Sequence, residues 1–244
     1  MLDHELMFEL SHPGRLKALQ ILSEKPHRLT DMSQSLKLTS AEVSRHLGRL
    51  TQANLITKNG EGKYVLTPFG GMILFELSKL RFLTQHSKYF STHLLSVIPD
   101  ELQWLNAMSK SNMIKGTLEL MSLIEDLTNS AKSYVFLISD QPMRSVRDAN
   151  IQKAKKHIEF RMIYPRNSEI PTEYLGKRKL PIEVRVLDKV PLSLKLNESR
   201  GGLALPDLGG KVDYSFALVG EDPHFLRWLG LLFEHFWENA DPVR

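Results

Sequence analysis

The spacing of apolar positions along the first 70 residues predicts helices and then a pair of strands. Leu16, Leu19 and Leu22 share one face of a predicted helix over residues 13–24, because side chains three or four positions apart lie on the same side of a helix. A shorter helix is predicted over 29–38, a third over 40–53, and two strands around the turn sequence NGEG within 55–66. The N-terminal region is therefore predicted to be three helices followed by a β-hairpin.

Residues that favour helix ends mark the boundaries of these elements. Pro13 is tolerated in the first turn of a helix. Thr30 is predicted to cap the second helix, and Thr39 or Ser40 the third. Asn54 suits the left-handed residue that follows a helix, where Gly is commoner. The second and third helices are thus joined by a tight turn, as in a helix-turn-helix motif.

Residues 69–98 are predicted to form one long amphipathic helix, which Pro99 ends. Its apolar positions include Leu74 and Leu77. Apolar residues left over after the helix packs on its own domain would form a dimer interface, or the helix would pack on the C-terminal domain of the same chain. The pattern does not distinguish these two partners. The predicted domains are accordingly a winged helix over 1–70, a linker or dimerisation helix over 71–99 and an α/β domain over 100–244.

Beyond residue 100 the pattern changes to alternating helices and strands. Helices are predicted over 114–132 and 144–157, and a last helix begins with Asp222 as its cap and Pro223 in its first turn. The predicted strands are 133–140, 158–165, 182–188, 192–199, 201–207 and 213–220. These alternations indicate βαβ units with an antiparallel extension, forming one sheet flanked by helices. The predicted fold class is α/β with an N-terminal winged helix-turn-helix.

The last helix carries an aromatic stripe that is predicted to be a buried core face. Its large apolar residues recur at spacings of three and four, which is typical of a helix packed on a sheet. A ligand pocket lined by aromatic rings is the less common alternative. The stripe comprises Phe225, Trp228, Leu229, Leu232, Phe233, Phe236 and Trp237.

Composition and charge narrow the class of protein. The chain has 244 residues, 42% of them apolar and 25% charged, and it contains no cysteine, so disulfides, thiolate metal sites and cysteine nucleophiles are excluded. Neither a signal peptide nor an apolar run of about 20 residues is evident, and we expect a cytoplasmic protein with no membrane partner. Residues 1–99 carry 12 Lys and Arg against 8 Asp and Glu, whereas residues 100–244 carry 20 of each. The excess of positive charge predicts that the N-terminal module meets a polyanion.

The outward face of the third helix carries the residue types that bind DNA. Val43, Leu47 and Leu50 define its buried side, and Arg on the opposite side can pair with guanine while Ser and His can bond to base edges or phosphates. Lysines beside the hairpin tip suit backbone phosphates. A solvated helix face is the alternative for these polar residues, and the order of helices, turn and hairpin favours DNA. The predicted DNA-binding residues are Ser40, Glu42, Ser44, Arg45, His46, Arg49, Lys58 and Lys63.

Two stretches of this region resemble a known family. The sequence TSAEVSRHLGRLTQANLI resembles the Ser-x-His-Leu-x-x-Leu-x-x-Ala-Gly-Leu signature of ArsR-like winged-helix repressors, and KYVLTPFG resembles the end of their wing. The resemblance covers about residues 11–71 and implies that helix 40–53 enters the major groove of double-stranded DNA while wing 55–66 follows the backbone. Asn54 stands where the family usually has Gly. The cysteines of the metal-sensing members are absent, so no metal and no cofactor are expected.

The C-terminal half is similar to the middle domain of the archaeal methanogenesis regulatory protein family. The residues that carry the similarity are IPDEL at 98–102, IEVRVLD at 182–188 and the stretch 210–240. That domain is distantly related to the phospholipase D fold. The resemblance implies an archaeal transcription regulator whose C-terminal domain senses an unknown small-molecule effector or mediates assembly.

An enzyme would need a catalytic motif. Phospholipase-D-like chemistry uses His-x-Lys followed by Asp, with His as nucleophile. Only His86 has a lysine two positions later, and His93 occupies the place of the Asp. These two histidines, seven apart, are predicted to be solvated rather than metal ligands. The basic runs at 153–157 and 176–179 are likewise predicted to be solvated surface.

The sequence therefore predicts a homodimeric, sequence-specific DNA-binding transcriptional regulator that is not an enzyme. A winged-helix module that binds protein is the alternative, and it would be expected to show an acidic or apolar face where this chain has Arg45 and Arg49. Neither the operator nor the residues of an effector pocket can be read from the pattern.

Overall fold

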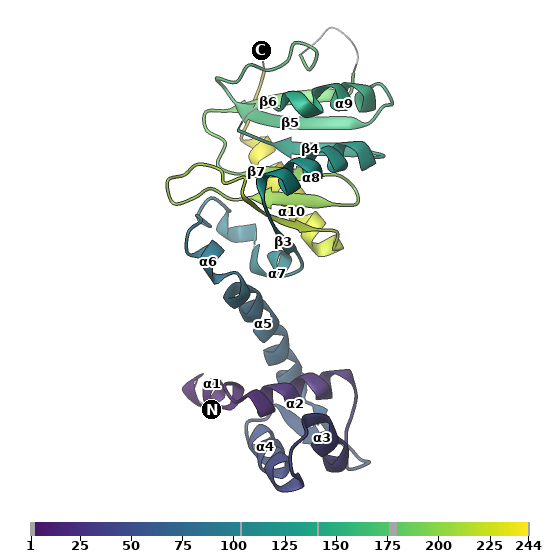
Figure 1. Ribbon diagram of the computed structural model, residues 1–244, viewed down its shortest axis with the longest axis vertical. Helices are drawn as coiled ribbons and strands as arrows, with labels where there is room; N and C mark the ends of the chain where they lie inside the picture. Colours follow the sequence, from purple (N-terminus) through teal and green to yellow (C-terminus); the bar gives the residue numbers. More distant parts are fainter. Residues whose placement is uncertain (1–2, 103, 141, 176–179, 244) are drawn as a thin grey trace. The chain divides into compact units, whose positions relative to one another are not determined.

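The computed structural model describes residues 3–102, 104–140, 142–175 and 180–243 (Figure 1). The chain divides into two compact units, Met1–Phe82 and Leu83–Arg244. The boundary falls inside helix α5, Pro68–Gln85. Each unit has its own hydrophobic core and is described separately.

The N-terminal unit consists of helices followed by a hairpin. Its elements before α5 are α1 (Asp3–Leu10), α2 (Pro13–Glu24), α3 (Leu29–Leu36), α4 (Ser40–Gln52), β1 (Ile56–Lys58) and β2 (Tyr64–Leu66). The three predicted helices and the hairpin are confirmed. Helix α1 was not predicted, because only Leu6 and Leu10 of this short segment pack on the core, and two apolar positions are too few for a periodic signal.

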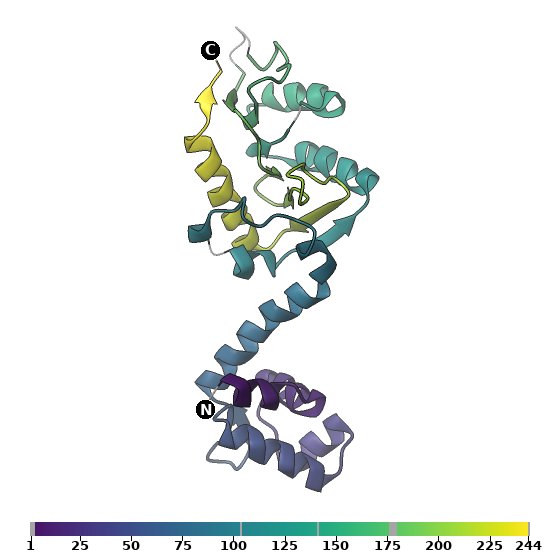
Figure 2. The same cartoon turned by 90° about the vertical axis from the view of Figure 1, so that its left-hand side faces the viewer.

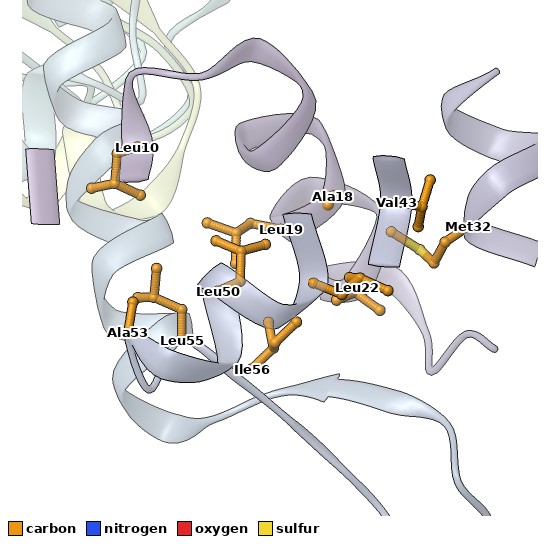
Figure 3. Packing of buried hydrophobic residues seen from close by; sticks show 11 residues of the cluster. Leu10, Ala18, Leu19, Leu22, Met32, Val43, Leu50, Ala53, Leu55 and Ile56 are labelled. Atoms are coloured by element: carbon orange, nitrogen blue, oxygen red, sulfur yellow. The ribbon is translucent and has the colours of Figure 1, made fainter. Parts of the chain in front are cut away.

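The core of this unit gathers apolar side chains from every helix of the region (Figure 3). Leu19 of α2, Met32 of α3 and Leu50 of α4 are fully buried, as is Leu55 just before the hairpin. A buried side chain of this size contributes about 1.5–3 kcal/mol relative to an exposed one. This shared core fixes the orientation of α4 relative to α2 and α3.

The ends of the helices follow the predicted chemistry with one exception. The Thr39 hydroxyl accepts a hydrogen bond from the Glu42 N–H at 3.3 Å, and the Glu42 carboxylate accepts one from the Thr39 N–H at 2.9 Å. Asn54 has φ +58°, as predicted for the left-handed residue after α4. The prediction that Thr30 caps α3 is wrong. The cap is Arg28, two residues before Thr30, and α3 begins at Leu29 because Asp31 accepts a hydrogen bond from the Arg28 N–H at 3.1 Å.

The hairpin is held at both of its ends. Strands β1 and β2 pair in antiparallel register, with Ile56 opposite Leu66 and Lys58 opposite Tyr64. At the tip the Asn59 side chain accepts hydrogen bonds from the N–H groups of Glu61 and Lys63, both at 3.0 Å.

The predicted long helix over 69–98 is wrong in its length. Helix α5 ends at Gln85, a single turn α6 spans Ser87–Phe90, and His93 then forms an isolated bridge with Asp207. The helix ends early because the residues that follow it pack within the C-terminal unit. Tyr89 is buried there, and its ring stacks on that of His93 with 3.9 Å between the ring centroids.

The C-terminal unit is built on one eight-stranded mixed sheet in the order β10-β6-β5-β4-β7-β8-β9-β3. Strands β4, β5 and β6 run parallel, and all other neighbours are antiparallel. The antiparallel extension is confirmed, and β4 and β5 with the helix between them form a predicted βαβ unit, whereas no helix is described between β5 and β6. The strands are β3 (Asn112–Lys115), β4 (Tyr134–Ile138), β5 (Glu159–Pro165), β6 (Ile182–Leu187), β7 (Ser193–Leu196), β8 (Gly201–Ala204), β9 (Phe216–Gly220) and β10 (Asp241–Pro242).

Helices cover both faces of this sheet. Figure 2 shows α10 (Pro223–Glu238) on one face and α8 (Thr117–Ser130) and α9 (Arg144–Ala154) on the other. The remaining helical turns are η1 (Asp100–Leu102) and α7 (Trp104–Met108). The predicted helix over 114–132 is wrong at its start, because residues 112–115 pair with β9 as an edge strand and Gly116 turns into α8 with φ +114°.

The predicted burial of the aromatic stripe on α10 is confirmed for all its residues except Phe236, which is partly exposed. Phe233 stacks on Phe136 of β4 with 4.7 Å between the ring centroids. Asp222 caps the helix by accepting a hydrogen bond from the His224 N–H at 2.8 Å. The stripe therefore joins the helix to the sheet.

Candidate nucleic-acid interface

Helix α4 has one face in the core and one in solvent. Val43 and Leu47 have no exposed surface. Ser40, Ser44 and Arg45 are all exposed on the other face. Because the buried residues fix the rotation of the helix about its axis, these short polar side chains and one arginine are presented outward together.

Glu42, also predicted to bind DNA, has a structural role at the start of α4. Its carboxylate accepts hydrogen bonds from the Thr39 hydroxyl at 2.7 Å and from the Thr39 N–H at 2.9 Å. These hydrogen bonds lower the pKa of the Glu42 carboxyl. The negative charge near the helix N-terminus is also favourable for the helix dipole.

Arg49 lies in an ion-pair network that the sequence did not reveal. Its Nε lies 3.0 Å from Glu9 Oε2, and the same carboxylate is 3.1 Å from Nε of the buried Arg15. The hydrogen bond from Arg49 lowers the pKa of Glu9. Glu9 belongs to the unpredicted helix α1, and the ring of its neighbour Phe8 lies 5.0 Å from the Arg49 guanidinium carbon. No signal of sequence spacing links residues that are 40 positions apart.

His46 is half-buried rather than free on the outer face. Its ring centroid lies 4.4 Å from that of His12 at the start of α2. Burial lowers the pKa of His46, and the positive neighbours His12, Arg15 and Arg45 lower it further. The imidazole therefore favours its neutral form, which can both donate and accept a hydrogen bond.

The two lysines of the hairpin flank its tip: Lys58 is the last residue of β1, and Lys63 immediately precedes β2. Lys63 Nζ is 2.7 Å from the exposed carboxylate of Glu61. Lys58 Nζ lies 5.0 Å from the centroid of the Tyr64 ring. An exposed ion pair contributes at most about 1 kcal/mol, so the pairing with Glu61 is easily exchanged for another anion.

The histidines of the linker differ from the prediction. His93 was predicted to be solvated, but it is buried, with Nε2 3.2 Å from Asp213 Oδ2 and Nδ1 2.8 Å from the Tyr89 carbonyl oxygen. Burial lowers the pKa of His86, which is partly exposed. The two side chains therefore do not share a solvated helix face.

Lys153 of the basic run 153–157 donates hydrogen bonds to the carbonyl oxygens of Asn129 and Ala131 at the end of α8, and the run 176–179 lies outside the described residues. Among the residues that the structure describes, no group of three His, Cys, Asp or Glu is arranged to hold a metal ion. No helix within the described ranges is long and apolar enough to cross a membrane.

Comparisons with known proteins agree with the geometry of the N-terminal unit. Residues 12–58 match the family model described as bacterial regulatory protein, arsR family. No curated protein matches the chain. The match spans α2 to β1 and so contains the helix-turn-helix and the first strand of the hairpin.

Several solved structures are similar to the chain at low identity. TrmBL2, described as an archaeal chromatin protein with a novel mode of DNA binding, has a TM-score of 0.46 and 14% identity, with 100% of both chains covered. NucT from Helicobacter pylori has a TM-score of 0.45 and 13% identity over 55% of this chain and 99% of its own. Nuc from Salmonella typhimurium, a phospholipase D family member, has a TM-score of 0.40 and 11% identity with the same coverage. With TM-scores below 0.5, these likenesses carry no functional argument.

The fold and exposed face of α4 define a helix-turn-helix protein of the DNA-binding class. Residues 12–58 form a helix-turn-helix domain of the arsR type, and the chain is a DNA-binding transcriptional regulator.

Proposed function

We propose that the chain binds duplex DNA sequence-specifically, with α4 in the major groove and the hairpin along the phosphate backbone. The observation that carries this proposal is the exposed face of α4, where Ser40, Ser44 and Arg45 lie opposite fully buried Val43 and Leu47. A helix positioned in this way behind a tight turn fits the major groove.

The side chains divide by role. Arg45 is free to pair bidentately with a guanine, and Ser40 and Ser44 are short enough to reach base edges or phosphates. Lys58 and Lys63 are positioned for phosphates. Arg49 would contact DNA through the part of its guanidinium that Glu9 does not occupy. His46 would contact DNA as a neutral imidazole. Glu42 would contribute mainly by stabilising the start of α4.

We also infer a homodimer, built on the exposed side of α5. Phe69, Met72 and Phe75 recur every three residues and are 40%, 67% and 48% exposed. A contiguous apolar strip of this kind on a soluble protein is typical of an interaction surface. A second copy would place two α4 helices about 34 Å apart on a pseudo-palindromic operator.

The C-terminal unit is proposed to sense an effector or to assist assembly, and to act by binding rather than by catalysis. The resemblance of its sequence to an archaeal regulator supports this role. Duplex DNA as the ligand implies action in the compartment that holds the chromosome, which is the cytoplasm of an archaeal cell.

The test uses the full chain and an operator selected from random duplexes. Arg45→Ala is expected to weaken operator binding by about 1–3 kcal/mol and to relax the preference at one base pair. Lys63→Ala is expected to weaken all duplexes about equally. Lys189→Ala, which changes an exposed lysine of the C-terminal unit, is the control and should leave binding unchanged. The proposal is wrong if wild-type affinity for duplex DNA does not fall steeply between about 50 and about 200 mM salt.

A further inference from the structure

An open groove of about 670 Å³ lies between the start of α2 and the exposed side of α4. His12 and Lys17 line it from the α2 side, and Arg45 and His46 line it from α4. The groove shares Arg45 with the outward face of α4, so it continues the surface that the proposed function uses.

The described residues that line this groove carry more positive than negative charge. Within the described part of the chain, Lys17 and Arg45 form no ion pair and no hydrogen bond. Glu42 is the one carboxylate among the described lining residues, and it is occupied by the hydroxyl and N–H of Thr39. An ammonium and a guanidinium lining one groove outnumber the single charge of Glu42, and this excess of positive charge attracts an anion.

The start of α2 adds hydrogen-bond donors to the same groove. His12 caps the helix through Nδ1, which accepts a hydrogen bond from the Gly14 N–H at 3.1 Å. Because Nδ1 accepts, a neutral His12 carries its proton on Nε2, where it can donate. Gly14 allows His46 to approach, since a Cβ at this position would lie 3.3 Å from His46 Nε2.

The titration of His46 gives a second sign of the positive potential. Burial lowers its pKa, and His12, Arg15 and Arg45 lower it further, against the opposing effect of Glu42. A site whose surrounding charges disfavour a proton favours a negatively charged ligand for the same reason.

We propose that this groove binds one phosphate of the DNA backbone, held by Lys17 and His12, beside the base contact of Arg45. The inference rests on the proposed function, because the phosphate belongs to the same duplex that α4 reads. DNA is favoured over a free anion because the groove opens on the side of α4 that carries Arg45. The role of this contact is to set the register of α4 on the duplex, since phosphate contacts position a protein while base contacts specify sequence.

The experiment measures how binding depends on salt. Each phosphate neutralised by the protein adds about 0.9 to the slope of log affinity against log salt. Full-length wild type, Lys17→Gln and Lys25→Gln are titrated against one random-sequence duplex. Lys25 is an exposed lysine at the other end of α2, so it is the matched control for the same charge change on the same helix. Urea unfolding verifies that all three chains are folded.

Of the two lysine substitutions, only the one in the groove is expected to change the salt dependence of DNA binding. Lys17→Gln should lower the slope by about 1 and weaken binding up to about tenfold at about 0.1 M salt, while Lys25→Gln keeps the wild-type slope. Adding His12→Asn, which retains a helix-capping side chain, should weaken binding further. A wild-type slope in Lys17→Gln, or an equal loss in both lysine variants, overturns the groove site. Absence of salt-dependent binding by the wild type would instead contradict the proposed function itself.

Discussion

At the scale of single residues, a few buried polar groups determine how charged side chains are oriented and which of them are ionised. Glu9 holds both Arg15 and Arg49, so one carboxylate in α1 orients a guanidinium on the outer side of α4. Lys195 in β7 is the opposite case, because it is buried without a carboxylate in contact. Its Nζ donates to the Thr128 hydroxyl at 2.6 Å and to the Ile124 carbonyl oxygen at 2.8 Å, and burial lowers its pKa to about 7.

Lys195 should therefore make stability depend on pH. A free lysine has a pKa of about 10.4, so between about pH 7 and about pH 10 the unfolded chain binds a proton that the folded chain does not. The free energy of unfolding of the wild type should then rise with pH across this window, and the penalty is complete below it. In Lys195→Met this rise should be smaller, as measured by urea unfolding near pH 7 and near pH 9.5. The exposed Lys132→Met is the control. An unchanged rise in Lys195→Met would contradict the assigned burial.

At the scale of elements, the starts of α3 and α4 are each set by a pair of residues three positions apart. Thr39 and Glu42 cap α4 reciprocally, which is the capping-box arrangement. Thr30 has the right side chain for a cap, but it lies inside α3, where its hydroxyl is 3.5 Å from Asp31 Oδ1. The start of α4 matters for function because it bears Ser40 and Ser44.

The two threonines provide a matched test. Thr39→Ala should lower the free energy of unfolding of the N-terminal unit by about 1 kcal/mol, because the Glu42 N–H at the helix start loses the hydroxyl that accepts its hydrogen bond. Thr30→Ala should change it by less than about 0.5 kcal/mol. Urea unfolding followed by circular dichroism measures both. Equal effects of the two substitutions would refute the capping role of Thr39.

At the scale of the whole molecule, α5 carries an exposed apolar strip made of Phe69, Met72 and Phe75. Ile73, Leu74 and Leu77 of this helix pack on the core of the N-terminal unit. Met72 and Phe75 of the same helix are not part of this core and are exposed. One helix thus carries a core face and a second apolar face, and the homodimer proposal accounts for the second.

This proposal can be tested by the oligomeric state in solution. Met72→Glu with Phe75→Glu should shift the full chain from dimer to monomer in sedimentation velocity, because charges are costly to bury in an interface. Affinity for a duplex with two half-sites should fall while binding to one half-site persists. Leu118→Glu, at an 82% exposed leucine of the C-terminal unit, is the control. A wild-type chain that is monomeric at high concentration would contradict the dimer.

The sequence by itself determined the features that depend on neighbours along the chain. Helices α2 to α4, a cap at Thr39 or Ser40, the left-handed Asn54 and most strands of the sheet follow from side chains a few positions apart, whose spacing and backbone preferences are local. Only the tertiary structure decided the existence of α1, the partner of Arg49, the edge strand β3, the early end of α5 and the burial of His93. Each of these depends on a contact between residues far apart in sequence: Glu9 with Arg49 across 40 positions, and His93 with Asp213 across 120. No periodic pattern records such contacts, because they form only when the packed cores bring the segments together.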